Sequence, residues 1–250
     1  MKTILNIIAG VVAMAISTNT FAAQYESYQL PVDPAEPVIT MDFQGDRLIR
    51  IDAAPTLSIL ADGTVIMPQS YAHTKAYKSK ITLEELQELL NFVISENHFF
   101  DYNKQAVKAE LRKLKTKSMP VHVSTTIITV NANEQSKTVR HASLSQGHLI
   151  PQIEQLLQVK LRLEQLMSMV KIGGKKELSK WLKAANDELK WKSPKEAPFQ
   201  ESDLQGAEIR ADGSIYVRFA RSNKDTITSV TTDIAADGKR LISVSSPKSK

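Results

Sequence analysis

The stretch Pro55-Thr-Leu-Ser-Ile-Leu-Ala-Asp-Gly-Thr-Val-Ile-Met67 decides the first part of the fold. Two runs of β-forming residues, 56–60 and 64–67, flank the pair Asp62-Gly63. An Asp-Gly pair tolerates the positive φ angles of a tight primed turn. With β-forming residues on both sides, the stretch therefore predicts a β-hairpin.

Other strand-forming stretches lie on both sides of this hairpin. Upstream, residues 38–43 and 48–51 flank Gln44-Gly45-Asp46 and predict a second hairpin. Downstream, the β-branched run 121–130 is expected to pair with 137–144 through a polar loop. Four short strands joined by turns are predicted near the C-terminus: 208–210, 214–220, 226–234 and 240–245.

Helices are predicted from capping signals and from the spacing of apolar residues. Thr82-Leu83-Glu84-Glu85 is a capping box, and the helix that begins there is expected to end near Asn97. Pro151 lies in the first turn of a long helix over 149–170, which Gly173-Gly174 ends. Two further amphipathic helices are predicted over 104–117 and 175–191.

Together these elements predict an α+β fold, in which an antiparallel sheet has helices packed on one face and a small antiparallel β-meander follows at the C-terminus. The long helix has an apolar seam that would suit a dimer. Its apolar stripe is wider than such a seam, which favours packing on a sheet. The expected divisions are a signal peptide over 1–22, an irregular arm over 23–37, an α+β domain over 38–172, a helix with a Pro-containing linker over 175–198, and the meander over 199–250.

The first 22 residues have the features of a secretory signal peptide. Lys2 is followed by an apolar run over 4–16 and by Thr20-Phe21-Ala22, with small residues at the −3 and −1 positions of a cleavage site before Ala23. The apolar run is too short to span a bilayer, and no later stretch is long and apolar enough. We therefore expect an exported protein, periplasmic or secreted, without a transmembrane segment in the mature chain.

The composition narrows the class of protein. The chain is 42% hydrophobic and 24% charged, which is ordinary for a globular protein. It has no cysteine, which excludes disulfides, thiolate zinc sites and cysteine nucleophiles, and which suits a bacterial envelope. Its formal net charge of +5 is well below that of a nucleic-acid-binding protein and implies only weak attraction to anionic lipid or glycan.

Five stretches follow one another in a recognisable order: 55–65, 82–86, Phe99-Phe100, 124–130 and 138–141. Taken in this order, they resemble a group of exported bacterial proteins that carry a domain of unknown function. The resemblance covers about residues 38–170 and implies an exported bacterial protein, but no activity and no site residues. The basic stretch 104–117 is a departure from that pattern.

Motifs for catalysis or for cofactor binding are missing from the sequence. No serine lies in a nucleophile elbow, and there is no phosphate-binding glycine loop. The Ala-Asp-Gly triplets at 61, 211 and 236 are explained as hairpin turns rather than as calcium loops. No cofactor or metal site is expected, because none of the histidines has metal-ligand spacing; they are His73, His98, His122, His141 and His148.

The basic helices are the candidate binding elements. Over 104–117 a narrow apolar stripe of Val107, Leu111 and Leu114 is surrounded by cations, with Glu110 as the one acid. Such a helix is explained either as a solvated face over a core contact or as a site for an anionic surface. The candidate residues are Lys104, Lys108, Arg112, Lys113, Lys115 and Lys117, and a second cluster is formed by Lys175, Lys176, Lys180 and Lys183.

Three functional hypotheses follow from the sequence. The first is a non-catalytic envelope protein that binds a protein partner or an anionic envelope component, with the edges of the C-terminal meander as the surface for a protein partner. The second is a hydrolase or metal-dependent enzyme whose site assembles from scattered histidines and carboxylates. The third is an inhibitor or chaperone-like factor with an apolar groove near Trp181 and Trp191. The sequence does not indicate an oligomeric state.

Overall fold

The computed structural model describes residues 27–45, 54–69, 75–113, 124–142, 144, 150–210, 212–223, 226–234 and 240–245. The predicted signal peptide, the expected strand 48–51 and the candidate residues Lys115 and Lys117 lie outside the described residues. Within the described ranges, no helix is both long and apolar enough to cross a membrane.

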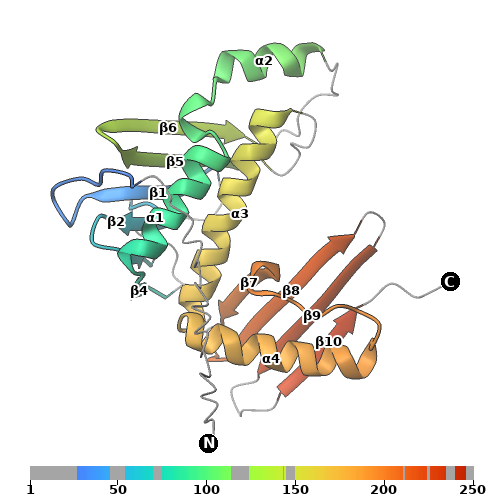
Figure 1. The fold of residues 1–250 in the computed structure, drawn as a ribbon. Helices are drawn as coiled ribbons and strands as arrows, with labels where there is room; N and C mark the ends of the chain where they lie inside the picture. The colour runs from blue at the N-terminus through green and yellow to red at the C-terminus, as the bar shows by residue number, and fades with distance from the viewer. Residues whose placement is uncertain are drawn as a thin grey trace, which may run out of the picture.

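The described elements form two antiparallel sheets with helices packed against them, which confirms the predicted α+β fold (Figure 1). The first sheet has the strand order β4-β3-β2-β1-β5-β6, with bounds β1 Pro37–Gln44, β2 Leu57–Leu60, β3 Thr64–Met67, β4 Tyr77–Lys80, β5 Thr125–Ala132 and β6 Gln135–Ala142. The second sheet has the order β10-β9-β8-β7, with bounds β7 Leu204–Ile209, β8 Ile215–Asn223, β9 Thr226–Ile234 and β10 Arg240–Ser245. The α-helices are α1 Leu83–Asn91, α2 Lys104–Lys113, α3 Pro151–Lys171 and α4 Lys175–Lys192, and a π-helical turn, Phe92–Glu96, extends α1.

The hairpins follow the turn chemistry of the sequence. The hairpin at Asp62-Gly63 is confirmed, since β2 and β3 pair on either side of it and Gly63 has a φ of 83°. The β5–β6 loop is shorter than predicted, because Asn133 and Glu134 adopt φ angles of 53° and 59° and close a two-residue turn. In the sheet, β1 has β2 and β5 as its neighbours.

The first core lies between the six-stranded sheet and the helices α1 and α3 (Figure 1). Alternate residues of β5 are buried, as the two-residue period of a strand requires. The long helix α3 buries a wide stripe that includes Leu156, Leu157 and Leu163, while Leu161 is 47% exposed. In this structure α3 is therefore a core helix, as the width of its apolar stripe predicts.

A second core lies between α4 and the four-stranded sheet (Figure 1). The segment 175–198 is expected to be a helix and a linker. Its helix, α4, covers the second sheet and contributes to this core. Helix α3 joins the two cores, because Val170 is buried in the first and Met169 packs against the second. The residues buried in the second core are Ile172, Leu178, Trp181, Ala185, Leu189, Phe199, Leu204, Ala207, Val217, Phe219 and Val230.

The N-terminal arm, predicted to be irregular, is anchored to the first core by Tyr28. Tyr28 is 3% exposed, and its backbone N–H donates to Gln87 Oε1 at 2.7 Å. Its hydroxyl lies 2.5 Å from Ser95 Oγ. Nearby, the backbone N–H of Gln29 donates to Asn133 Oδ1 at 2.7 Å, so the arm also bonds to the β5–β6 turn.

Candidate functional site

Helix α2 begins at a well-formed cap. The Asn103 side chain accepts hydrogen bonds from the backbone N–H groups of Gln105 at 2.9 Å and Ala106 at 3.1 Å. The backbone N–H of Asn103 itself donates to Gln152 Oε1 of α3 at 2.9 Å. The start of α2 is therefore held against α3, and Figure 1 shows the helix at one end of the molecule.

A small apolar contact and one lysine attach this helix to the first core. Val107 is 3% exposed, and Leu111 packs against the core from the same side of the helix. Lys137, on the edge strand β6, donates from Nζ to the carbonyl oxygens of Phe100 and Tyr102 just before α2, the second bond at 2.8 Å. These contacts position α2 while leaving most of its surface in solvent.

The exposed surface of α2 is basic. Lys104, Lys108, Arg112 and Lys113 are all exposed, and none of them forms an ion pair with a described residue. The first three follow one another at i,i+4 spacing and so lie along one stripe, where like charges destabilise a helix by roughly 0.2–0.5 kcal/mol per pair. This repulsion is offset at the end of the helix, because the helix dipole favours the positive charges of Arg112 and Lys113 in the last turn. The exposed, unpaired cations of the stripe are open to an anion from outside. We call these four residues the α2 basic surface.

His141 lies beside this surface. It is 9% exposed on β6, it pairs in register with Thr126 of β5, and its Nδ1 has no hydrogen-bond partner. Burial lowers the pKa of His141 below its ordinary value, and the positive charge of Lys104 acts in the same direction. His141 is therefore favoured in its neutral form.

Two of the four lysines in the second predicted cluster form ion pairs with described residues, while Lys176 and Lys183 do not. Lys175 pairs with Glu85 of α1, and Lys180 Nζ lies 2.6 Å from Glu177 Oε1. The Lys175 ammonium holds the pKa of Glu85 below its ordinary value, together with the capping-box bond from Thr82. The Lys175–Glu85 pair links α4 to α1.

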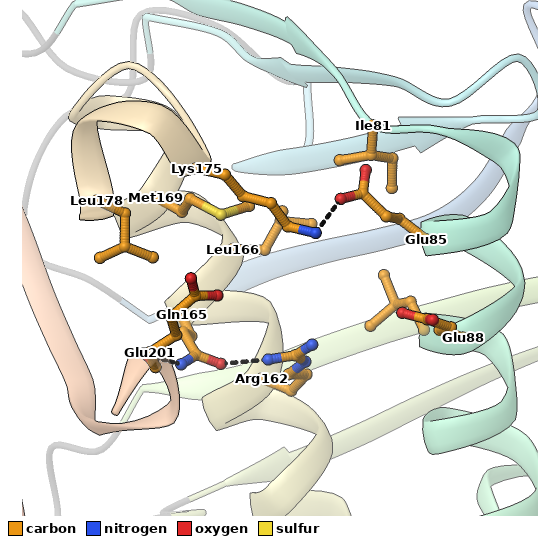
Figure 2. Close-up of a pocket in the computed structure, with 11 residues that line it drawn as sticks. Ile81, Glu85, Glu88, Arg162, Gln165, Leu166, Met169, Lys175, Leu178 and Glu201 are labelled. Carbon is orange, nitrogen blue, oxygen red and sulfur yellow. Dashed lines mark hydrogen bonds and ion pairs between the residues drawn. The ribbon is translucent and has the colours of Figure 1, made fainter. Parts of the chain in front are cut away.

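A cavity of about 90 Å³ lies between α1, α3 and α4 (Figure 2). The Lys175–Glu85 pair crosses one side of it, and Arg162 Nη1 donates to Gln165 Oε1 at 2.6 Å on the other. Gln165 in turn donates from Nε2 to the backbone oxygen of Glu201 at 2.7 Å. Small-molecule sites usually measure about 300–1,000 Å³, so this cavity suits a few water molecules rather than a metabolite.

A wider groove of about 670 Å³ runs beside this cavity along α3. It shares Glu88, Arg162 and Gln165 with the cavity and is lined on its far side by Leu204 and Gln205. Among the described residues, three buried side-chain atoms lack a hydrogen bond, namely His141 Nδ1, Ser214 Oγ and Thr232 Oγ1. A fourth, Asp233 Oδ1, has the ion pair with Arg210 Nη1 at 3.0 Å. None of them belongs to a residue that lines the cavity or the groove.

Two of the five histidines lie in described segments. His98 is exposed at the end of the π-helical turn, with its Nδ1 3.6 Å from Asp101 Oδ2, and His141 is buried on β6. His73, His122 and His148 lie outside the described residues. In the ranges that the structure describes, no group of three or more histidine or carboxylate side chains is placed to hold a metal ion.

Comparison of the chain with protein-family models, with curated proteins and with solved structures gives no match. The resemblance to exported bacterial proteins therefore stays a prediction. The candidate site is defined by the residues of this chain alone, and the α2 basic surface is the strongest candidate among them.

Proposed function

We propose that this chain is an exported, non-catalytic bacterial protein that binds an anionic component of the cell envelope through the α2 basic surface. The observation that carries the proposal is a set of exposed, like-charged residues on a helix whose other side is anchored to the core. Their only acidic neighbour on the helix is Glu110. The predicted signal peptide supports exposure of this surface to the envelope.

The geometry of α2 suits a phosphate- or carboxylate-bearing surface. Lys104 and Arg112 are eight residues apart, so the stripe is about 12 Å long at the rise of an α-helix. Each cation near an anionic membrane surface contributes about 1 kcal/mol, so four of them give a few kcal/mol of attraction. Attraction of this kind is screened by salt, because the Debye length falls to about 3 Å at 1 M ionic strength.

The test is co-sedimentation of the mature protein with a bacterial envelope fraction at low and at high ionic strength. The proposal expects binding at low ionic strength that high ionic strength removes. A Lys108→Ser/Arg112→Ser variant is expected to lose most of the low-salt binding, since two central cations are gone. Binding that resists both salt and this variant would contradict the proposal and would favour a specific protein partner on another surface.

A further inference from the structure

Trp191 is the most unusual exposed side chain of the described residues. It lies in the last turn of α4 and is 76% exposed, whereas Trp181 of the same helix is buried at 9%. Tryptophan is highly buried on average in folded proteins. In proteins that contact a bilayer, tryptophan is enriched at the membrane–water interface, where its amphipathic ring lies at the level of the headgroups. Lys192 Nζ lies 5.7 Å from the centroid of the Trp191 ring.

A stripe of exposed residues leads along α4 to this tryptophan. At 100° per residue the stripe covers about 100° of the helix circumference, directly opposite the residues that α4 buries in the second core. Its members are Lys176, Lys180, Lys183, Asp187, Lys190 and Trp191, all of them exposed. The buried residues on the opposite side are Leu178, Trp181, Ala185 and Leu189.

The stripe carries an unbalanced positive charge. Lys176, Lys183 and Lys190 form no ion pair with a described residue, and Lys180 pairs with Glu177 beside the stripe. Asp187 is the one acid within it. From residue 176 to residue 191 the stripe extends for about 22 Å at the rise of an α-helix.

We infer that the outer face of α4 docks on a bilayer that contains anionic phospholipids, with Trp191 inserted at the level of the headgroups. The lysines complement the headgroup phosphates, and the indole ring is suited to the boundary between water and acyl chains. This stripe supplies the aromatic anchor that α2 lacks. The inference rests on the proposed function for contact with the envelope, but not on the α2 basic surface.

The two tryptophans make the inference directly measurable, because the chain has no others. The experiment titrates the full mature protein with vesicles of phosphatidylglycerol and phosphatidylcholine, and in parallel with vesicles of phosphatidylcholine alone, while tryptophan emission and acrylamide quenching are recorded. With the anionic vesicles we expect a blue shift and reduced quenching. A Trp191→Phe variant retains buried Trp181, and its emission is expected not to shift.

The charge requirement is tested with a Lys176→Ser/Lys183→Ser/Lys190→Ser variant. It is expected to need at least about tenfold more anionic lipid for half of the emission change, since three cations have been removed. An Asp187→Asn variant should need less lipid than the native chain. An unshifted Trp191 with anionic vesicles, or an equal shift with neutral vesicles, would overturn the inference.

The same titration separates this inference from the proposed function. A Lys108→Ser/Arg112→Ser variant whose emission still shifts, and which still sediments with the envelope, contradicts the proposed role of α2 and supports the role of α4. The opposite result has two parts: the Lys108→Ser/Arg112→Ser variant no longer sediments with the envelope, and the Trp191 emission of the native protein stays unshifted on anionic vesicles. That result would support the proposed role of α2 and contradict the role of α4.

Discussion

Single residues hold several turns and buried contacts of this fold, and Gly63 is the clearest case. Its φ of 83° is strained for other residues, and a Cβ at this position would meet the backbone oxygen of Ile81. Gly213 has the same φ of 83° but nothing within 4 Å of a built Cβ. The two glycines therefore separate the cost of backbone strain from the cost of a steric clash.

We expect Gly63→Ala to lower the free energy of unfolding by at least about 1 kcal/mol more than Gly213→Ala does. Both variants introduce a left-handed alanine, but only the first must displace the backbone at Ile81. Urea denaturation of the two variants measures the difference. Equal losses would show that the clash is relieved without cost.

His141 predicts a dependence of stability on pH. Burial lowers the folded-state pKa of His141 below the unfolded value of about 6.5. Between these two pKa values the unfolded chain binds the extra proton, so the free energy of unfolding falls as the pH drops below about 6.5. A His141→Gln variant is expected to lose part of this pH dependence.

The control for this prediction is His98→Gln, since His98 is exposed on another segment. It makes the same substitution away from the buried site, so the pH profiles of the two variants are compared directly. Denaturation midpoints between pH 5 and pH 8 provide the measurement. A His141→Gln variant with an unchanged pH profile would show that another group is responsible.

At the scale of elements, the sequence predicts the helix ends and turns that depend on residues close together in the chain. The capping box places α1, because Thr82 Oγ1 accepts from the backbone N–H of Glu85 at 3.1 Å and Glu85 Oε2 accepts from that of Thr82 at 2.8 Å. Tyr28 gives no such signal, since its partners Gln87 and Ser95 are 59 and 67 residues away. Contacts of this kind depend on tertiary packing and not on a pattern.

The same distinction holds for the candidate site. The cationic character of 104–117 is visible in the sequence, and the structure leaves its described cations exposed and unpaired among the described residues. The pairing of Lys175 with Glu85 joins segments 90 residues apart, so the loss of this lysine from the second cluster was not predictable. The exposure of Trp191 also depends on which face of α4 the second sheet covers.

The capping box supplies the prediction at this scale. Thr82→Ala removes the acceptor for the backbone N–H of Glu85, and we expect it to lower the free energy of unfolding by about 1 kcal/mol. Thr82→Ser keeps the hydroxyl and should stay close to the native value. Chemical denaturation compares the two variants, and a loss equal in both would assign the effect to the methyl group instead.

At the scale of the whole molecule, two hydrophobic cores share the helix α3. The polar links between their elements include the Lys175–Glu85 pair and the bond from Gln165 to the backbone of Glu201. Leu189, which is 1% exposed, belongs to the second core alone. The second core can therefore be weakened without changing the first.

We expect Leu189→Ala to destabilise the second core by about 2–5 kcal/mol and to make unfolding occur in two steps. Both tryptophans lie in α4, so tryptophan fluorescence reports on this core, while far-ultraviolet circular dichroism reports on the whole chain. The fluorescence transition of the variant should come at lower urea concentration than the circular-dichroism transition. Coincident transitions would show that α3 couples the two cores into one cooperative unit.

The central claim, that the α2 basic surface binds an anionic envelope component, is tested most directly by charge reversal. Lys108→Glu/Arg112→Glu is compared with Lys75→Glu/Lys78→Glu, which changes the net charge equally at exposed residues in and just before β4. The account predicts that the α2 variant loses low-salt sedimentation with the envelope fraction, while the β4 variant keeps most of it. Equal loss in both variants would contradict the claim, because net charge and not α2 would then determine binding.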